Sequence, residues 1–233
     1  MSSRRRPPFI APAPVKAAPA RKKKRSTALS FATYVEKIVK EEGTRGIVKD
    51  AKITTGLLLR VLATRIIDNS NILLEDTDKE TVKVKAIEVA SHLTLPVELA
   101  KAATAEANST LERFTSAAQK GAKREARATR AGLTISVSRP GRLLHRLSIA
   151  RRISAGAPVY LAAILEYVAR QILNRAADLA GSKGAKGEEH NVRITVKHIF
   201  SAIRGDRDLN ELFEAHQTII GGGAISKGNE EAK

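Results

Sequence analysis

The feature that most constrains the fold is a pattern of helical segments, short then long then short, which occurs twice in the 233-residue chain. In the first half, the segment from Lys52 to Glu75 has apolar residues at helical spacing and predicts one long amphipathic helix. At about 1.5 Å per residue, that helix would be roughly 36 Å long. A helix of this length cannot bury its apolar face unaided, so it needs a long partner.

Shorter helices flank this long one. We expect a helix from near Ser30 that ends at Gly43 and Gly46, a further short helix after Val82, and one over 96–118 with Pro96 in its first turn. The apolar residues that indicate the helices of this half are Phe31, Tyr34, Val35, Ile38, Leu57, Leu58, Val61, Leu62, Ile66, Leu73, Ile87, Val89, Leu93, Leu99, Ala103 and Leu111.

The second half repeats the pattern. Leu143, Leu144 and Leu147 indicate a short helix, and Pro158 opens a long one. The core stripe of that long helix is predicted at Leu161, Leu165, Val168 and Ile172. A third helix is predicted from the spacing of Val196, Ile199 and Ile203, and Asp206 could cap a last short helix that contains Leu209, Leu212 and Phe213. The periodicity predicts two similar helical units and does not name them.

The charge balance points to a polyanionic partner. Lys and Arg total 41 against 24 Asp and Glu, which leaves a net charge of +17. Residues 1–30 hold nine of these basic residues and no acid, and they show no helical period, which predicts a disordered basic tail. Aromatic residues are only 3% of the chain, so surfaces that stack single-stranded bases are disfavoured. Duplex DNA is the leading partner, and an anionic membrane surface is the weaker alternative.

The sequence offers no constellation for catalysis. Cysteine is absent, which excludes disulfides and thiolate metal sites, and the five histidines lack metal-ligand spacing. No apolar run approaches the about 18 residues that span a bilayer. We therefore predict no enzyme activity, no cofactor, no metal and no membrane partner.

Particular motifs resemble those of core histones. The segments RAGL at 130–133, AGAPVYLAAILEY at 155–167 and AIRGDRDLNELF at 202–213 are similar to type-2A core histones. The segments LTLPVELAKAATAE at 93–106 and RFTSA at 113–117 resemble the last part of type-2B core histones. The presence of both kinds of segment in one polypeptide, with the 2B-like half first, resembles the fused histone doublets of some giant DNA viruses.

This resemblance implies an all-α protein in which two histone folds form an intramolecular handshake, a pseudo-heterodimer with a disordered basic N-terminal tail. The implied parts are a tail at 1–29, a 2B-like histone fold with a C-terminal helix at 30–119, a basic linker at 120–131, a 2A-like histone fold at 132–223 and a short C-terminal tail at 224–233. Fusion would replace bimolecular association by an intramolecular one of high effective concentration.

Register with the family also implies which residues touch DNA, as phosphate or groove-width contacts with little base specificity. The histone octamer is itself the best-known example of this binding mode, in which arginines enter the minor groove. The implied DNA-binding residues are Arg21, Lys22, Lys23, Lys24, Arg25, Lys49, Lys52, Lys79, Thr81, Lys85, Arg139, Arg142, Arg152 and Arg193.

In the family, an acidic patch serves as a docking site for chromatin factors, and here the resemblance implies a depleted one. Its remaining members are Glu98, Glu106, Glu166, Asp206 and Asp208, whereas Gln171, Asn174 and Arg207 stand where the family carries acids. We therefore expect weak binding of patch-directed peptides, and a tight complex that depends on Glu166 would contradict this expectation.

The implied function is packaging of double-stranded DNA into nucleosome-like particles, as the equivalent of the 2A–2B pair. The implied partners are a type-three/type-four histone pair or fused doublet, and a second copy of this chain in a pseudo-octamer. The implied location is a chromatin-like DNA compartment, in a virion and in a viral factory or host nucleus. The alternative is a histone-fold regulatory subunit that binds promoter DNA without wrapping it, and a base-specific site would favour that reading.

Overall fold

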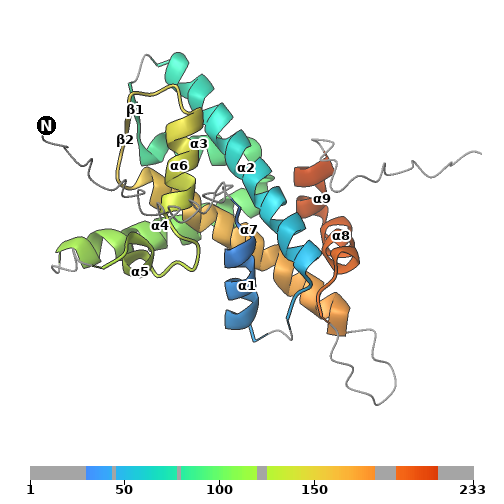
Figure 1. Ribbon diagram of the computed structural model, residues 1–233. Coiled ribbons are helices and arrows are strands. Elements are labelled where there is room, and N and C mark those ends of the chain that lie inside the picture. The colour runs from blue at the N-terminus through green and yellow to red at the C-terminus, as the bar shows by residue number, and fades with distance from the viewer. Residues whose placement is uncertain (1–29, 44–45, 78–79, 120–124, 182–192, 215–233) are drawn as a thin grey trace, which may run out of the picture.

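The computed structural model describes residues 30–43, 46–77, 80–119, 125–181 and 193–214 (Figure 1). The elements of the first half are α1 (Ala32–Glu41), α2 (Lys49–Glu75), β1 (Thr81–Val82), α3 (Val84–Thr94) and α4 (Val97–Gln119). Those of the second half are α5 (Arg127–Ala131), α6 (Ser138–Leu147), β2 (Arg152–Ile153), α7 (Ala157–Gly181), α8 (Val196–Gly205) and α9 (Arg207–Glu214). The described part is therefore mostly helical, as predicted, apart from two strands of two residues each.

The two halves interlock around their long helices. In Figure 1, α2 and α7 cross at the centre, and they contact each other directly. Helix α3 of the first half packs on α7, while α6 and α8 of the second half pack on α2. Each long helix is thus covered by helices of the other half, which is how both apolar faces are buried.

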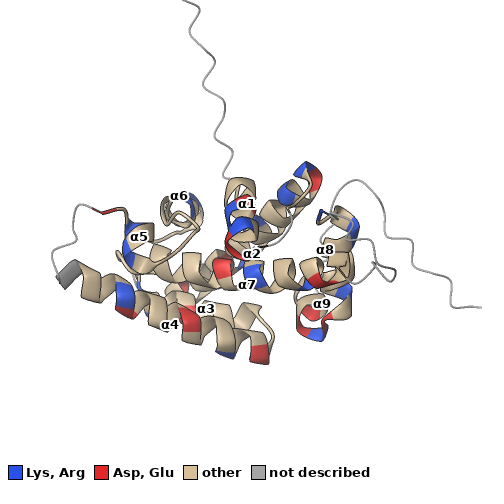
Figure 2. Cartoon of the chain, turned by 90° about the horizontal axis from the view of Figure 1, so that it is seen from below, with Lys and Arg blue, Asp and Glu red and all other residues tan. Residues whose placement is uncertain are grey.

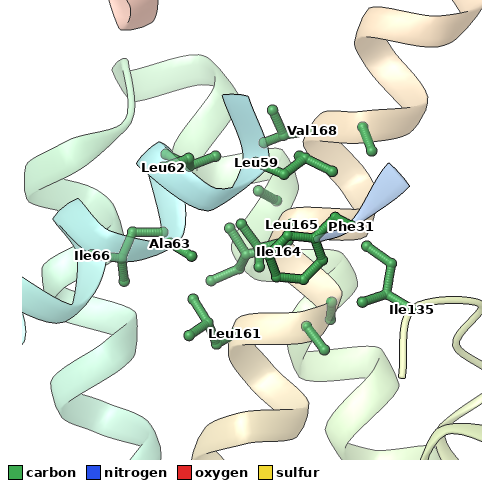
Figure 3. Packing of buried hydrophobic residues seen from close by; sticks show 14 of the residues in the cluster. Phe31, Leu59, Leu62, Ala63, Ile66, Ile135, Leu161, Ile164, Leu165 and Val168 are labelled. Carbon is green, nitrogen blue, oxygen red and sulfur yellow. The ribbon is translucent and has the colours of Figure 1, made fainter. Parts of the chain in front are cut away.

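The core forms where the two long helices meet (Figure 3). The stripe of Leu161, Leu165, Val168 and Ile172 on α7 is fully buried, as predicted. In Figure 3, this stripe lies beside Leu59, Leu62 and Ile66 of α2, which are 0–1% exposed. Phe31, just before α1, fills the crossing and is also 0% exposed. Burial of these side chains is the main stabilising contribution, because removal of apolar surface from water drives folding.

Three of the apolar residues that indicate the helices of the first half lie at the surface. Leu57 is 50% exposed, Val89 37% and Leu93 64%. The buried face of α2 is centred on Leu58 and Leu62, and Leu57 points about 100° away from Leu58 around the helix. The apolar pattern of α2 is therefore wider than the face of this helix that is buried.

Helix α1 approaches α2 at a glycine. A Cβ built on Gly56 would lie 2.8 Å from the backbone nitrogen of Ala32, closer than real Cβ contacts allow. The missing side chain at this position therefore sets the close crossing of α1 over α2.

The helix ends follow their sequence signals. Pro158 lies in the first turn of α7, and the side chain of Asp206 accepts the amide hydrogen of Leu209 at 2.8 Å, so the predicted cap of α9 is confirmed. Helix α2 begins at Lys49 rather than at the expected Lys52.

The sequence predicts a linker over 120–131, but the last residues of this segment form α5. This helix ends at Gly132, whose φ of +69° suits a residue without a Cβ. The Arg130 guanidinium lies 4.8 Å from the centroid of the Phe114 ring on α4, and Ala131 is fully buried. The connection therefore packs on α4 before the second half begins.

Candidate nucleic-acid interface

One end of the molecule is formed by the strand pair β1–β2, which joins the two halves in parallel. Thr81 lies opposite Arg152, and Val82 opposite Ile153. The amide of Arg152 donates to the carbonyl of Glu80 at 3.1 Å, and that of Ser154 donates to Val82 at 3.0 Å. The side chain of Arg152 is exposed and Thr81 is half-buried. This end therefore presents a guanidinium and a hydroxyl from different halves on adjacent strands.

The other end repeats this arrangement with the roles of the halves exchanged. Ile47 and Ile194 form a parallel bridge, in which the amide of Val48 donates to Ile194 and the amide of Ile194 donates to Gly46, both at 2.9 Å. Arg193 precedes the bridge and Lys49 opens α2, and both are exposed. A cation from each half therefore stands beside this bridge as well.

The two loop pairs lie at opposite ends of α2. The bridge at Ile47 comes before its first residue and β1 follows its last, so the 27 residues of α2 separate them by about 40 Å.

The N-terminal end of α6 meets the N-terminal end of α1 between these two sites. Arg139 donates to the carbonyl of Ser30, and its guanidinium lies 5.2 Å from the centroid of the Tyr34 ring. Arg142, one turn further along α6, is exposed. Figure 2 shows α1 and α6 along one edge of the molecule and α4 along the opposite edge.

One of the expected DNA contacts is already engaged within the protein. The ammonium of Lys52 is 2.9 Å from Glu36, with its side chain only 23% exposed, so an internal ion pair already engages it. This pairing lowers the pKa of Glu36, first through the hydrogen bond from Lys52. Lys85 is exposed in the first turn of α3. Lys79 and the cluster Arg21, Lys22, Lys23, Lys24 and Arg25 lie outside the described residues.

The expected acidic residues do not form one exposed cluster. Glu166 is 5% exposed, and its carboxylate accepts the amides of Thr134 and Ile135, both at 2.9 Å. Arg170 donates to its other oxygen at 3.0 Å. Glu166 is therefore an internal structural acid, because burial requires these partners.

Glu98, Asp206 and Asp208 do come together, along a groove of about 140 Å³ between α4, α7 and α9. The groove also contains Arg175, which forms an ion pair with Asp206. Glu98 pairs with Lys101 at 3.0 Å, and Glu106 pairs with Arg113 at 2.7 Å further along α4. Cations of the chain itself thus offset much of the negative charge on this side.

Arg170 and Arg175 are the side chains that the sequence reasoning missed. Arg170 follows Glu166 by four residues on α7, and this spacing on a helix face could have predicted their ion pair. Burial alone would lower the pKa of Arg170, but its hydrogen bonds to Glu166 and Glu42 outweigh that effect and raise it. No comparable local signal relates Arg175 to Asp206, which lies between α8 and α9.

No protein-family model matches the chain. Within the described ranges, no helix is long and apolar enough to cross a membrane. The same ranges contain no group of three or more His, Asp or Glu side chains that could hold a metal ion. What the described residues offer is a series of cations at loop pairs and helix ends, which suits binding to a regular polyanion.

Proposed function

We propose that this chain packages double-stranded DNA, with two histone folds in an intramolecular handshake that serve as the equivalent of a 2A–2B histone pair. Two observations support this proposal. The sequence motifs resemble those of type-2A and type-2B core histones, and the helices of each half pack across the long helix of the other.

The observation that carries the proposal is the crossed pairing of loops. The segment before α2 bridges to the one before α8, and the segment after α2 pairs with the one before α7. Each pairing brings one exposed arginine to an end of α2, Arg193 at one and Arg152 at the other. The two ends are about 40 Å apart, close to the about 34–36 Å of one turn of DNA, so both can face the same groove.

The binding chemistry of these groups is directed at the DNA backbone. Arginine and lysine at loops and helix ends contact phosphates, and such contacts carry no base sequence directly. Helix N-termini add favourable partial charge, and the N-terminal ends of α1 and α6 meet between the two loop pairs. The proposed binding is therefore without base specificity, which disfavours a promoter-binding role.

Apolar side chains at the surface support a protein partner in addition to DNA. Ile72, Val89, Leu93 and Val97 are 37–68% exposed, on the last turns of α2, on α3 and at the start of α4. The hydrogen bond from Asn69 to Thr94, 2.8 Å long, joins α2 and α3 beside them. We assign this surface to the type-three/type-four histone pair or doublet, with two copies of each completing a pseudo-octamer.

Nuclease digestion of plasmid DNA reconstituted with the full chain tests the function. We expect a discrete protected fragment when a type-three/type-four pair is added, and none with this chain alone. A continuous smear in both reactions would reduce the chain to a non-specific basic coat.

The salt dependence of DNA affinity is a second measurement. Because binding phosphates releases counterions, the logarithm of the affinity should fall linearly with the logarithm of salt concentration. Arg152→Gln should reduce that slope by about one, and the exposed Arg207→Gln on α9 should leave it unchanged. A nearly flat dependence for the unmodified chain would contradict electrostatic binding.

A further inference from the structure

Helix α1 is held at both ends by arginines that belong to the other half of the chain. At its N-terminal end, Arg139 of α6 contacts Ser30 and Tyr34. At its C-terminal end, Arg170 of α7 contacts Glu41 and Glu42. Between these ends, the buried Val35, Ile38 and Val39 seat the helix in the core.

The C-terminal contact resolves an electrostatic conflict. Two carboxylates at a helix C-terminus face the negative end of the helix dipole, which disfavours them. Lys40, in the same turn, is directed to Glu36 at 3.4 Å. Arg170 is the cation that reaches Glu41, at 3.1 Å, and it also pairs with Glu42. The acids at the end of α1 are therefore compensated from the second half.

Arg170 is itself held in a fixed position. Its guanidinium also contacts Glu166 at 3.0 Å, and the carboxylate of Glu166 is buried and bound by the amides of Thr134 and Ile135. The hydroxyl of Thr134 donates to Glu41. An arginine fork that spans three carboxylates has little freedom to turn toward solvent, so this contact should persist when DNA is present.

The N-terminal contact is different in kind. Arg139 contacts the start of α1 through the backbone carbonyl of Ser30 and the ring face of Tyr34, and both of these groups are uncharged. A phosphate offers a charge-assisted, bidentate pairing that is stronger than either. If DNA binds beside the ends of α1 and α6, Arg139 is the residue that it would draw away.

We propose that Arg170 is a positioning residue that keeps α1 seated when DNA takes Arg139 away from Ser30 and Tyr34. The inference rests on the proposed DNA binding and goes beyond it. Arg170 touches no DNA; it preserves the place of α1 through Glu41 and Glu42. The two arginines then have different roles, since Arg139 changes from a protein partner to a phosphate and Arg170 keeps its protein partners.

Hydrogen exchange over α1, measured on the full chain with and without a DNA duplex, tests this proposal. The variants are Arg170→Gln, Arg139→Gln and, as a control of equal charge change, Arg207→Gln. In free protein, we expect Arg170→Gln to raise the exchange of α1 by no more than about threefold, because Arg139 and the core still hold it. In the DNA complex, the amides of α1 should exchange at least about tenfold faster in Arg170→Gln than in the unmodified chain.

The reciprocal variants separate positioning from general stability. Arg139→Gln should keep α1 protected in both states, because Arg170 remains. In the DNA complex, Arg170→Lys should protect α1 better than Arg170→Gln but less well than the unmodified chain, since one ammonium cannot bridge three carboxylates as the guanidinium does. Exchanging the charges, in Arg170→Glu with Glu42→Arg, should restore protection on DNA relative to Arg170→Glu alone.

Each contrary result is distinguishable. DNA binding with α1 equally protected in Arg170→Gln and in the unmodified chain would overturn this inference and leave the proposed function standing. Complete loss of α1 protection in free Arg170→Gln would also overturn it, because Arg139 would then fail to keep α1 in place even without DNA. Failure of the unmodified chain to bind DNA would overturn both.

Discussion

Glu166 shows how one buried carboxylate organises the start of the second half. Two backbone amides and one guanidinium surround it, and the amides belong to the chain between α5 and α6. The acid thereby fixes that segment against α7. Because charged groups form stronger hydrogen bonds than neutral ones, the negative charge matters as well as the oxygen atoms.

Replacing that carboxylate by an amide should destabilise the protein. We expect Glu166→Gln to lower the free energy of unfolding by about 1–3 kcal/mol, since an NH2 group would face a donor that the carboxylate satisfied. Urea unfolding followed by circular dichroism measures the change. The control is Glu98→Gln, because Glu98 is exposed and pairs with Lys101 at the surface. Equal unfolding midpoints for the two variants would contradict the structural role.

The ion pair of Glu36 with Lys52 predicts a dependence on pH. The pKa of Glu36 is lowered from its ordinary 4.5 in the folded protein. The contribution to stability is therefore fully present above pH 4.5 and is lost as the pH falls through the lower folded value. Glu36→Gln should lower the melting temperature at neutral pH, and the difference from the unmodified chain should disappear in acid. The exposed Glu112→Gln serves as the control, and a difference that grows toward acid would contradict this sign.

Exposed cations and internal ones look alike in the sequence. Lys49 and Lys52 are three residues apart, and the family register implies DNA contact for both, yet Lys49 is exposed and Lys52 is paired with Glu36 on another helix. Likewise, the family register assigns Glu166 to an acidic surface, although its partners lie inside. The sequence supplies the charges, whereas their pairing depends on helix crossings that no local pattern contains.

At the scale of elements, the helices were the most predictable part of the fold. Apolar spacing and helix-end residues such as Pro158 and Asp206 placed the long and short helices within a few residues. The strands β1 and β2 were not foreseen, because two residues are too few for an alternating pattern and the partner strand lies in the other half. Helix α5 was missed for a similar reason, since tertiary contact with Phe114 stabilises five residues that would not form a helix alone.

The apolar surface of α3 gives a prediction about the protein partner. Leu93 is 64% exposed, so Leu93→Asp should change the free energy of unfolding by less than about 0.5 kcal/mol. If this surface docks the type-three/type-four pair, the variant should lose the discrete nuclease-protected fragment and retain DNA binding on its own. The control is Leu57→Asp, which makes the same chemical change at a residue of α2 that is 50% exposed. An unaltered fragment with Leu93→Asp would remove α3 from the partner surface.

The whole molecule depends on contacts between its two halves. The long helices bury their stripes against each other, both loop pairs cross between halves, and α1 is held by arginines of the other half. In one polypeptide, these contacts form at an effective concentration that is about millimolar for a short connection. Joining the halves therefore removes the dependence on protein concentration that two separate chains would show.

Cleavage of the connection should restore that dependence. A protease site placed between Gln119 and Glu125 would allow the folded chain to be cut before α5. The uncut chain should have the same melting temperature at every protein concentration, because unfolding is then unimolecular. After cutting, each tenfold dilution should reduce the stability of the associated halves by about 1.4 kcal/mol. Differential scanning calorimetry over a dilution series measures both. A melting temperature of the uncut chain that rises with concentration would mean that its halves pair between molecules, because only an intermolecular contact responds to dilution.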